Sequence, residues 1–157
     1  MKPQSFDPQQ IGRYTVIRVH YEYANQPGGE KLFVVLKHAK VSEQVFCWCI
    51  KSTSQVQRFT DEMLEGCISY KANELSFFHQ DTVIDTANII TLLHDTLEKE
   101  ANLGRFRVEG KMPANFHEKF VKAVRASTTL EPKKKAKLLE AVGESLSHSN
   151  PTNSSTV

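Results

Sequence analysis

Short runs of apolar residues alternate with polar turns along residues 14–92. Many of these runs are rich in β-branched and aromatic residues, which is typical of β-strands. We expect strands at residues 14–21, 31–37, 44–50, 67–71, 81–85 and 88–92. The runs at 31–37 and 44–50 are apolar at consecutive positions, which indicates strands that are covered on both faces. Several short strands at hairpin spacing predict a small antiparallel barrel, an arrangement that removes exposed sheet edges.

Turn residues separate the expected strands. Pro27, Gly28 and Gly29 mark residues 24–30 as a turn, because proline sets φ for one corner and glycine accepts a positive φ. Residues 40–43 indicate a hairpin turn. The polar segment 55–65 is expected to form a short helix or a lid.

The pattern changes to helical spacing after the last expected strand. We expect a short helix at 93–101, an extended segment at 104–112, a helix at 113–126 and a second helix that begins near Pro132. One face of the helix at 113–126 carries apolar residues at helical spacing. These residues are Phe116, Phe120, Ala123 and Val124. The fold class is therefore mainly β within α+β, a small barrel with C-terminal helices.

The chain divides into four regions by composition. Residues 1–10 are expected to form a flexible arm, and 11–126 the barrel domain with its helix. Residues 127–147 form a basic helical extension. Residues 148–157 are polar and predict a disordered tail.

The composition is that of a globular protein, with 39% hydrophobic and 24% charged residues in a chain of 157. No apolar run approaches the roughly 20 residues that span a bilayer, so we expect no membrane partner. The polar N-terminus lacks the apolar stretch of a secretory signal. Cys47, Cys49 and Cys67 are odd in number and lack CxxC or zinc spacing, which predicts reduced thiols and a cytoplasmic location.

The net charge of +2 is unevenly distributed. Residues 1–100 hold 10 basic and 13 acidic residues, whereas residues 101–157 hold 10 basic and 5 acidic residues. A run of lysines, 133–135, opposes the dipole at the start of the expected last helix. The basic C-terminal part indicates a polyanion or an acidic partner, or alternatively a solvated helical surface.

Common catalytic motifs are absent. The sequence has no phosphate-binding glycine loop, no GxSxG and no HExxH, and we expect no metal and no cofactor. The six histidines are scattered without metal-ligand spacing. A site made by His20, His38 and His79 across the strands stays geometrically possible.

A cation and a group of hydroxyls are expected to meet at one rim of the barrel. Lys31 begins one apolar strand, and Lys51, Ser52, Thr53 and Ser54 end the next one. If these two strands pair antiparallel, the start of the first lies beside the end of the second. The result would be a phosphate pocket. The alternative is a charged strand end next to a Ser/Thr turn that bonds its own backbone.

The order of these segments resembles that of the MazF/PemK toxin family. In that family a basic residue leads an apolar strand of the "RPALVLS" kind, and the next strand ends in a "PITS"-like turn. Here the corresponding segments are 31–37 and 50–54. The family's later "IRTI" stretch corresponds to 83–92, and its final Gly-bounded strand and helix to 104–126. The resemblance covers residues 12–126, with lysine at position 31 where the family has arginine.

The resemblance implies an SH3-like barrel and a toxin component that cleaves single-stranded RNA as a metal-independent endoribonuclease. The substrate's own 2′-OH attacks the neighbouring phosphate. Lys31 and Thr53 take the catalytic positions. RNA would be bound by further residues of this rim: Lys51, Ser52, Ser54 and Arg58. Aromatic residues at 21, 23 and 59 would stack bases or pack in the core.

The resemblance also implies partners. Members of the family form homodimers and are held inactive by an acidic antitoxin. A second hypothesis is a non-catalytic barrel that binds nucleic acid or a protein through its basic C-terminal helices. A third is a structural or regulatory protein with the same barrel.

Overall fold

The computed structural model describes residues 5–22 and 28–145. The expected tail at 148–157 lies outside the described residues, as do part of the expected arm, part of the turn at 24–30, and Tyr23. The described chain is α+β and mostly β, as the sequence predicts.

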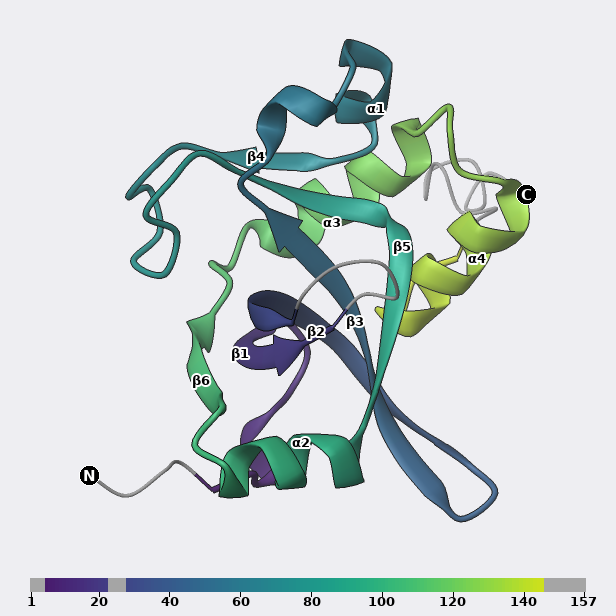
Figure 1. Cartoon of the computed structure of the whole chain (residues 1–157). Coiled ribbons are helices and arrows are strands. Elements are labelled where there is room, and N and C mark those ends of the chain that lie inside the picture. Colours follow the sequence, from purple (N-terminus) through teal and green to yellow (C-terminus); the bar gives the residue numbers. More distant parts are fainter. Residues whose placement is uncertain (1–4, 23–27, 146–157) are drawn as a thin grey trace.

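Six antiparallel strands form one sheet in the described part of the chain. The strands are β1 (Thr15–Tyr21), β2 (Gly29–Val41), β3 (Gln44–Thr53), β4 (Ile68–Tyr70), β5 (Thr82–Leu93) and β6 (Phe106–Lys111). Their order across the sheet is β4-β5-β3-β2-β1-β6. The sheet curls into a half-barrel with β4 and β6 at its edges, so the expected small barrel is confirmed in an open form (Figure 1).

Strand β5 differs from the sequence prediction, which placed two strands at 81–85 and 88–92. The register against β3 shifts between the pairs Ile50–Ile89 and Lys51–Asp85, which leaves a bulge in place of a turn. Inside the bulge, Asp85 Oδ1 accepts the backbone N–H of Ala87 at 2.9 Å. The polar residues that suggest a turn therefore bend one long strand.

Four α-helices and two 3₁₀ helices occur in the described residues. They are α1 (Asp61–Glu65), α2 (His94–Asn102), α3 (Phe116–Ala126), α4 (Pro132–Ala141), and the 3₁₀ helices Pro8–Gln10 and Val56–Arg58. The segment expected as a short helix or lid is thus helical, with Thr60 Oγ1 capping α1 by accepting the Met63 N–H at 3.2 Å. Helix α3 begins three residues after Pro113, which instead accepts a turn hydrogen bond from Phe116.

Apolar cores lie on both faces of the central strands. Val34 and Leu36 of β2 point to the core beneath α3 and α4, whereas Phe33 and Val35 point to the core closed by α2. We call these the α3–α4 core and the α2 core. Figure 1 shows α2 across one end of the curled sheet and α3 and α4 along its side. The uninterrupted apolar runs are therefore explained by two-sided burial.

The C-terminal and N-terminal segments both contribute to these cores. Leu138 and Leu139 of α4 are almost completely buried in the α3–α4 core. Phe6 packs edge-on against Phe106, with ring centroids 5.6 Å apart, at the border of the α2 core. Helix α4 thus shares a hydrophobic core with the sheet.

We predict that Leu139→Ala lowers the free energy of unfolding by about 2 to 5 kcal/mol, because it leaves a cavity in the α3–α4 core. The matched control is Leu103→Ala, since Leu103 is 56% exposed, and its effect should stay within about 0.5 kcal/mol. Urea denaturation of both variants measures the difference. Equal stabilities would contradict the packing of α4 against the sheet.

Candidate functional site

A polar cleft of about 580 Å³ opens where β2 begins and β3 ends. Its wall is completed by the segment that leads into β5. All six residues that the sequence analysis assigned to a site line this cleft. They are Lys31, Lys51, Ser52, Thr53, Ser54 and Arg58. We call it the cationic cleft, because Arg18 also lines it and Glu30 is the acidic residue among the lining residues.

The pairing of β2 with β3 brings these residues together. Phe33 is opposite Lys51 in the antiparallel ladder, so Lys31 and Thr53 each lie two residues beyond this pair, at the same end of the hairpin. Ser52 Oγ donates a hydrogen bond of 3.0 Å to the Leu32 carbonyl, which holds the two strands side by side at this level. The antiparallel arrangement expected from the sequence is therefore present.

The hydroxyls of Ser52 and Thr53 differ in what they can still do. Ser52 uses its single proton on the Leu32 carbonyl and can only accept a further hydrogen bond. Thr53 Oγ1 accepts the N–H of Gln55 at 3.1 Å, which leaves its own proton for donation. This bond is the local Ser/Thr turn of the alternative interpretation, yet it keeps Thr53 capable of donating to a phosphate oxygen.

Carboxylates behind the cleft hold two of its cations. Arg18 Nε lies 2.8 Å from Glu109 Oε1, and Lys51 Nζ lies 3.9 Å from Asp85 Oδ2. Burial favours a higher pKa for Glu109, but hydrogen bonds from Arg18 and Arg107 reverse this and hold the pKa below its usual range. The guanidinium of Arg18 is thus fixed in orientation at the cleft wall.

Sequence reasoning did not assign Arg18 to the cleft, and it named His79 only as a possible metal ligand. Arg18 is a charged residue between the buried Ile17 and Val19 of β1, and this interruption of an apolar strand was the available signal. His79 is exposed and follows Phe77 and Phe78, which are buried and anchor the loop before β5. Its place in the cleft depends on the path of that loop, which no periodicity in the sequence predicts.

Two of the aromatic residues proposed for base stacking, Tyr21 and Phe59, are not among the residues that line the cleft, and Tyr23 lies outside the described residues. Tyr21 packs edge-on against Phe33, with centroids 5.4 Å apart, beside the α2 core. Phe59 is half-buried and is not among the lining residues. The aromatic surface of the cleft comes from Phe77 and Phe78.

The possible metal site of His20, His38 and His79 is not formed. His79 lines the cationic cleft, and His20 Nε2 lies 3.6 Å from Glu22 Oε1. His38 instead meets Cys47 and His94 in a separate cluster, which the sequence analysis also missed. The signal is weak, because His94 is 56 residues away from His38 in the chain.

No protein-family model and no curated protein matches this chain. Among the described residues, no helix is both long enough and apolar enough to cross a membrane.

The ion pairs of Glu109 make a pH-dependent contribution to stability. The pKa of Glu109 is lower in the folded chain than its ordinary value of 4.5, so this contribution is complete above that pH and is lost as the pH falls below it. We predict that Glu109→Gln lowers the free energy of unfolding by about 1 kcal/mol at pH 7 and by less at pH 3.5. Thermal unfolding at both pH values measures this. Glu43→Gln, in the exposed β2–β3 turn, is the control, and a loss that does not shrink in acid would refute the assignment.

Proposed function

We propose that this protein is a metal-independent endoribonuclease that cleaves single-stranded RNA in the cationic cleft. One observation carries the proposal. The cleft gathers four cationic side chains, a hydroxyl that can donate and an imidazole at one end of a rigid hairpin. Cations and directed donors are the groups that stabilise a phosphate and the additional charge of its transition state. The order of segments shared with the MazF/PemK family supports the same function.

The proposed reaction uses the ribose 2′-OH as its nucleophile. The 2′ oxygen attacks the adjacent phosphorus while the bond to the 5′ oxygen breaks, which gives a 2′,3′-cyclic phosphate and a 5′-hydroxyl end. Lys31 stabilises the charge on the phosphorane, and Thr53 donates a hydrogen bond to a non-bridging oxygen. His79 accepts the 2′-OH proton, because imidazole is the side chain best suited to proton transfer near neutral pH. The leaving 5′ oxygen takes up a proton from solvent, and protonated His79 returns its proton to solvent, so no net proton is consumed.

The other cleft residues would bind the strand. Lys51 and Arg58 neutralise flanking phosphates, and the exposed Ser54 offers a hydrogen bond to the backbone of the RNA. Ser52 serves only as an acceptor, for example for a ribose hydroxyl. Phe77 and Phe78 provide an apolar floor beneath the polar rim.

We predict that the full chain cleaves a single-stranded RNA oligonucleotide in the presence of EDTA and leaves a 2′,3′-cyclic phosphate. Lys31→Ala and Thr53→Ala should each lower the rate by about 100- to 1,000-fold, because each removes one stabilising group. His79→Ala should lower it by about 100-fold or more. Gel electrophoresis and mass spectrometry of the products measure both rate and chemistry.

Two controls separate this activity from contamination. Lys71→Ala removes an exposed lysine outside the lining residues and should cleave like the wild type. An oligonucleotide with 2′-deoxyribose throughout should stay intact, since it lacks the nucleophile. RNA that remains whole with a large excess of wild-type protein would rule out the nuclease.

A second candidate function, RNA binding without cleavage, is favoured by a different surface. The half-buried Trp48 has Lys37 Nζ 4.5 Å and Lys137 Nζ 4.7 Å from its ring centroid. Lys137 belongs to α4, so this surface is the basic C-terminal region of the second hypothesis. Deleting α4 would not test it, because Leu138 and Leu139 are needed in the core.

Salt-dependent binding distinguishes the two surfaces. If RNA lies in the cationic cleft, Arg58→Ala should weaken binding and lower the slope of log affinity against log salt by about 0.7, the value for one phosphate of a single strand. Lys137→Ala should leave both quantities unchanged. The opposite pattern, measured by fluorescence anisotropy at several salt concentrations, would move the binding site to α4.

The proposal includes the partners expected for the toxin component of a toxin–antitoxin system. An acidic antitoxin segment would cover the four cationic residues of the cleft. A homodimer is supported by exposed apolar side chains of the β2–β3–β5 region, with Val41 61% and Leu93 36% exposed. An RNA substrate and three free thiols support a cytoplasmic location.

A further inference from the structure

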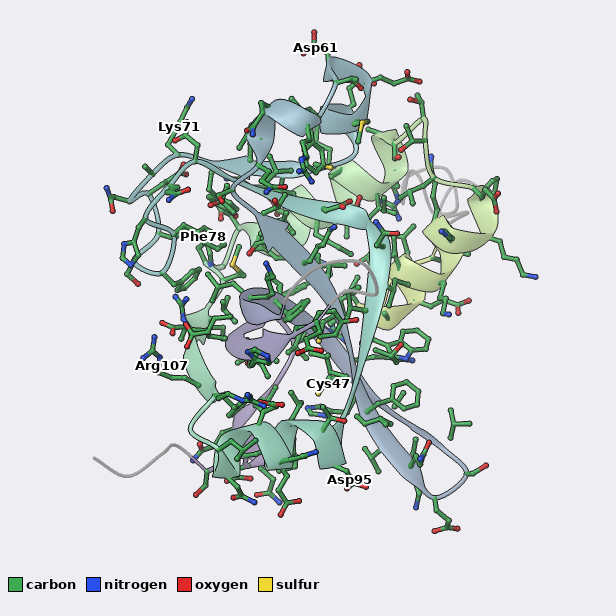
Figure 2. All side chains as sticks on the ribbon, viewed as in Figure 1. Cys47, Asp61, Lys71, Phe78, Asp95 and Arg107 are labelled. Atoms are coloured by element: carbon green, nitrogen blue, oxygen red, sulfur yellow. The ribbon has the colours of Figure 1, made fainter. Side chains whose placement is uncertain are left out.

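Two imidazoles and a thiol converge at the opposite end of the β2–β3 hairpin from the cationic cleft. His38 of β2 is paired with Cys47 of β3, and His94 is the first residue of α2. One nitrogen from each histidine and the Cys47 sulfur all lie within 4.8 Å of one another. Figure 2 shows Cys47 beside α2, well apart from Phe78 of the cleft. We call these residues the His–Cys cluster.

A backbone carbonyl orients the imidazole of His38 in this cluster. Nε2 of His38 is hydrogen-bonded to the carbonyl oxygen of Ile11, and a carbonyl can only accept, so Nε2 carries the proton. The lone pair of His38 must then be on Nδ1, which faces His94 and Cys47. Metal-binding histidines are characteristically held this way, with the second nitrogen donating to a carbonyl or carboxylate.

The distance between the Cys47 and His38 donor atoms is that expected around a tetrahedral metal ion. A Zn–N bond of about 2.0 Å and a Zn–S bond of about 2.3 Å place the two donors about 3.5 Å apart. The observed distance between Cys47 Sγ and His38 Nδ1 is 3.6 Å. The distance of 2.8 Å between His38 Nδ1 and His94 Nε2 is that of a hydrogen bond, and it must widen to about 3.3 Å around an ion.

The surroundings of the cluster suit a stable site with an open position. Cys47 is fully buried, whereas His38 and His94 are half-buried, so an ion can enter from the side of the imidazoles. The ring of Phe6 lies edge-on to His94 at 5.1 Å and limits its orientations. Asp95, next to His94, adds negative charge near the cluster.

We propose that His38, Cys47 and His94 bind one Zn²⁺ ion, with water as the fourth ligand. Imidazole nitrogen and thiolate sulfur are both common zinc ligands in proteins, and three protein ligands with one water is a known arrangement around zinc. Binding displaces the thiol proton of Cys47, while His94 keeps one proton by moving it from Nε2 to Nδ1. One proton is therefore released for each ion bound.

The ion would connect elements that are distant in sequence. It joins the β2–β3 hairpin to the start of α2, where Leu93 provides no side-chain cap. The His–Cys cluster shares no residue with the cationic cleft, so zinc binding is proposed independently of RNA cleavage. A failure to cleave RNA in EDTA would refute the proposed nuclease and leave the zinc site standing. A failure to bind zinc would refute the zinc site and leave the nuclease standing.

Titration of the metal-free full chain with Zn²⁺ in a calorimeter tests the proposal. We expect one ion per chain, release of one proton when buffers of different ionisation enthalpy are compared, and a higher melting temperature with zinc. Co²⁺ should give a thiolate-to-cobalt charge-transfer band and the visible bands of a tetrahedral ion.

Variants assign the ligands. Cys47→Ser should abolish the charge-transfer band, and His94→Ala should weaken zinc binding at least about 100-fold, with circular dichroism confirming that each variant is folded. Cys67→Ser and His20→Ala remove a thiol and an imidazole outside the cluster and should bind zinc like the wild type.

His94 is at a helix start and half-buried, so His94→Ala is the variant that tests the proposal if Cys47→Ser unfolds. Absence of saturable binding, a cobalt spectrum without a thiolate band, or equal affinity in His94→Ala would overturn it.

Discussion

The two-sided burial of β2 and β3 is the constraint on which the rest of this structure depends. Consecutive residues of β2, such as Val34 and Val35, enter different cores, so the hairpin is fixed by α2 on one face and by α3 and α4 on the other. A one-residue slip in register would exchange the two sets of side chains. The cationic cleft lies at one end of this hairpin and the His–Cys cluster towards the other, where Cys47 is part of the α2 core. The packing that fixes the hairpin therefore also positions both groups of residues.

The sequence predicted most elements because their signals are local. Apolar runs and helical spacing depend on neighbouring residues, and they placed the strands and the helices within a few residues of their observed bounds. The error at β5 has a physical cause. Asp85 and Thr86 have the composition of a turn, but Thr86 Oγ1 donates to the Gly66 carbonyl and Asp85 accepts from Ala87, so both are satisfied within a bulge. Those partners are visible only in the folded chain.

The two sites differ in how far the sequence could reveal them. The residues from Lys51 to Ser54 are adjacent in the chain, and the antiparallel pairing of two strands suffices to bring Lys31 beside them. His79 required the path of a loop, and His94 required the packing of α2 against the hairpin, which is decided by the whole α2 core. Local patterns carry no information about such long-range contacts, so the places of these two histidines in the fold could not be predicted from them.

The carboxylates behind the cationic cleft explain how its charges could act on a phosphate. Glu109 and Asp85 reduce the net positive field, which weakens long-range attraction of a polyanion. The hydrogen bond that Arg18 donates to Glu109 orients Arg18, and Asp85 attracts Lys51 from 3.9 Å, so less reorganisation is needed when charge develops beside them. A site built only to concentrate RNA would gain from omitting these carboxylates. The ion pairs of Glu109 and Asp85, together with a Thr53 proton that remains available for donation, are what the proposed chemistry at one phosphate depends on.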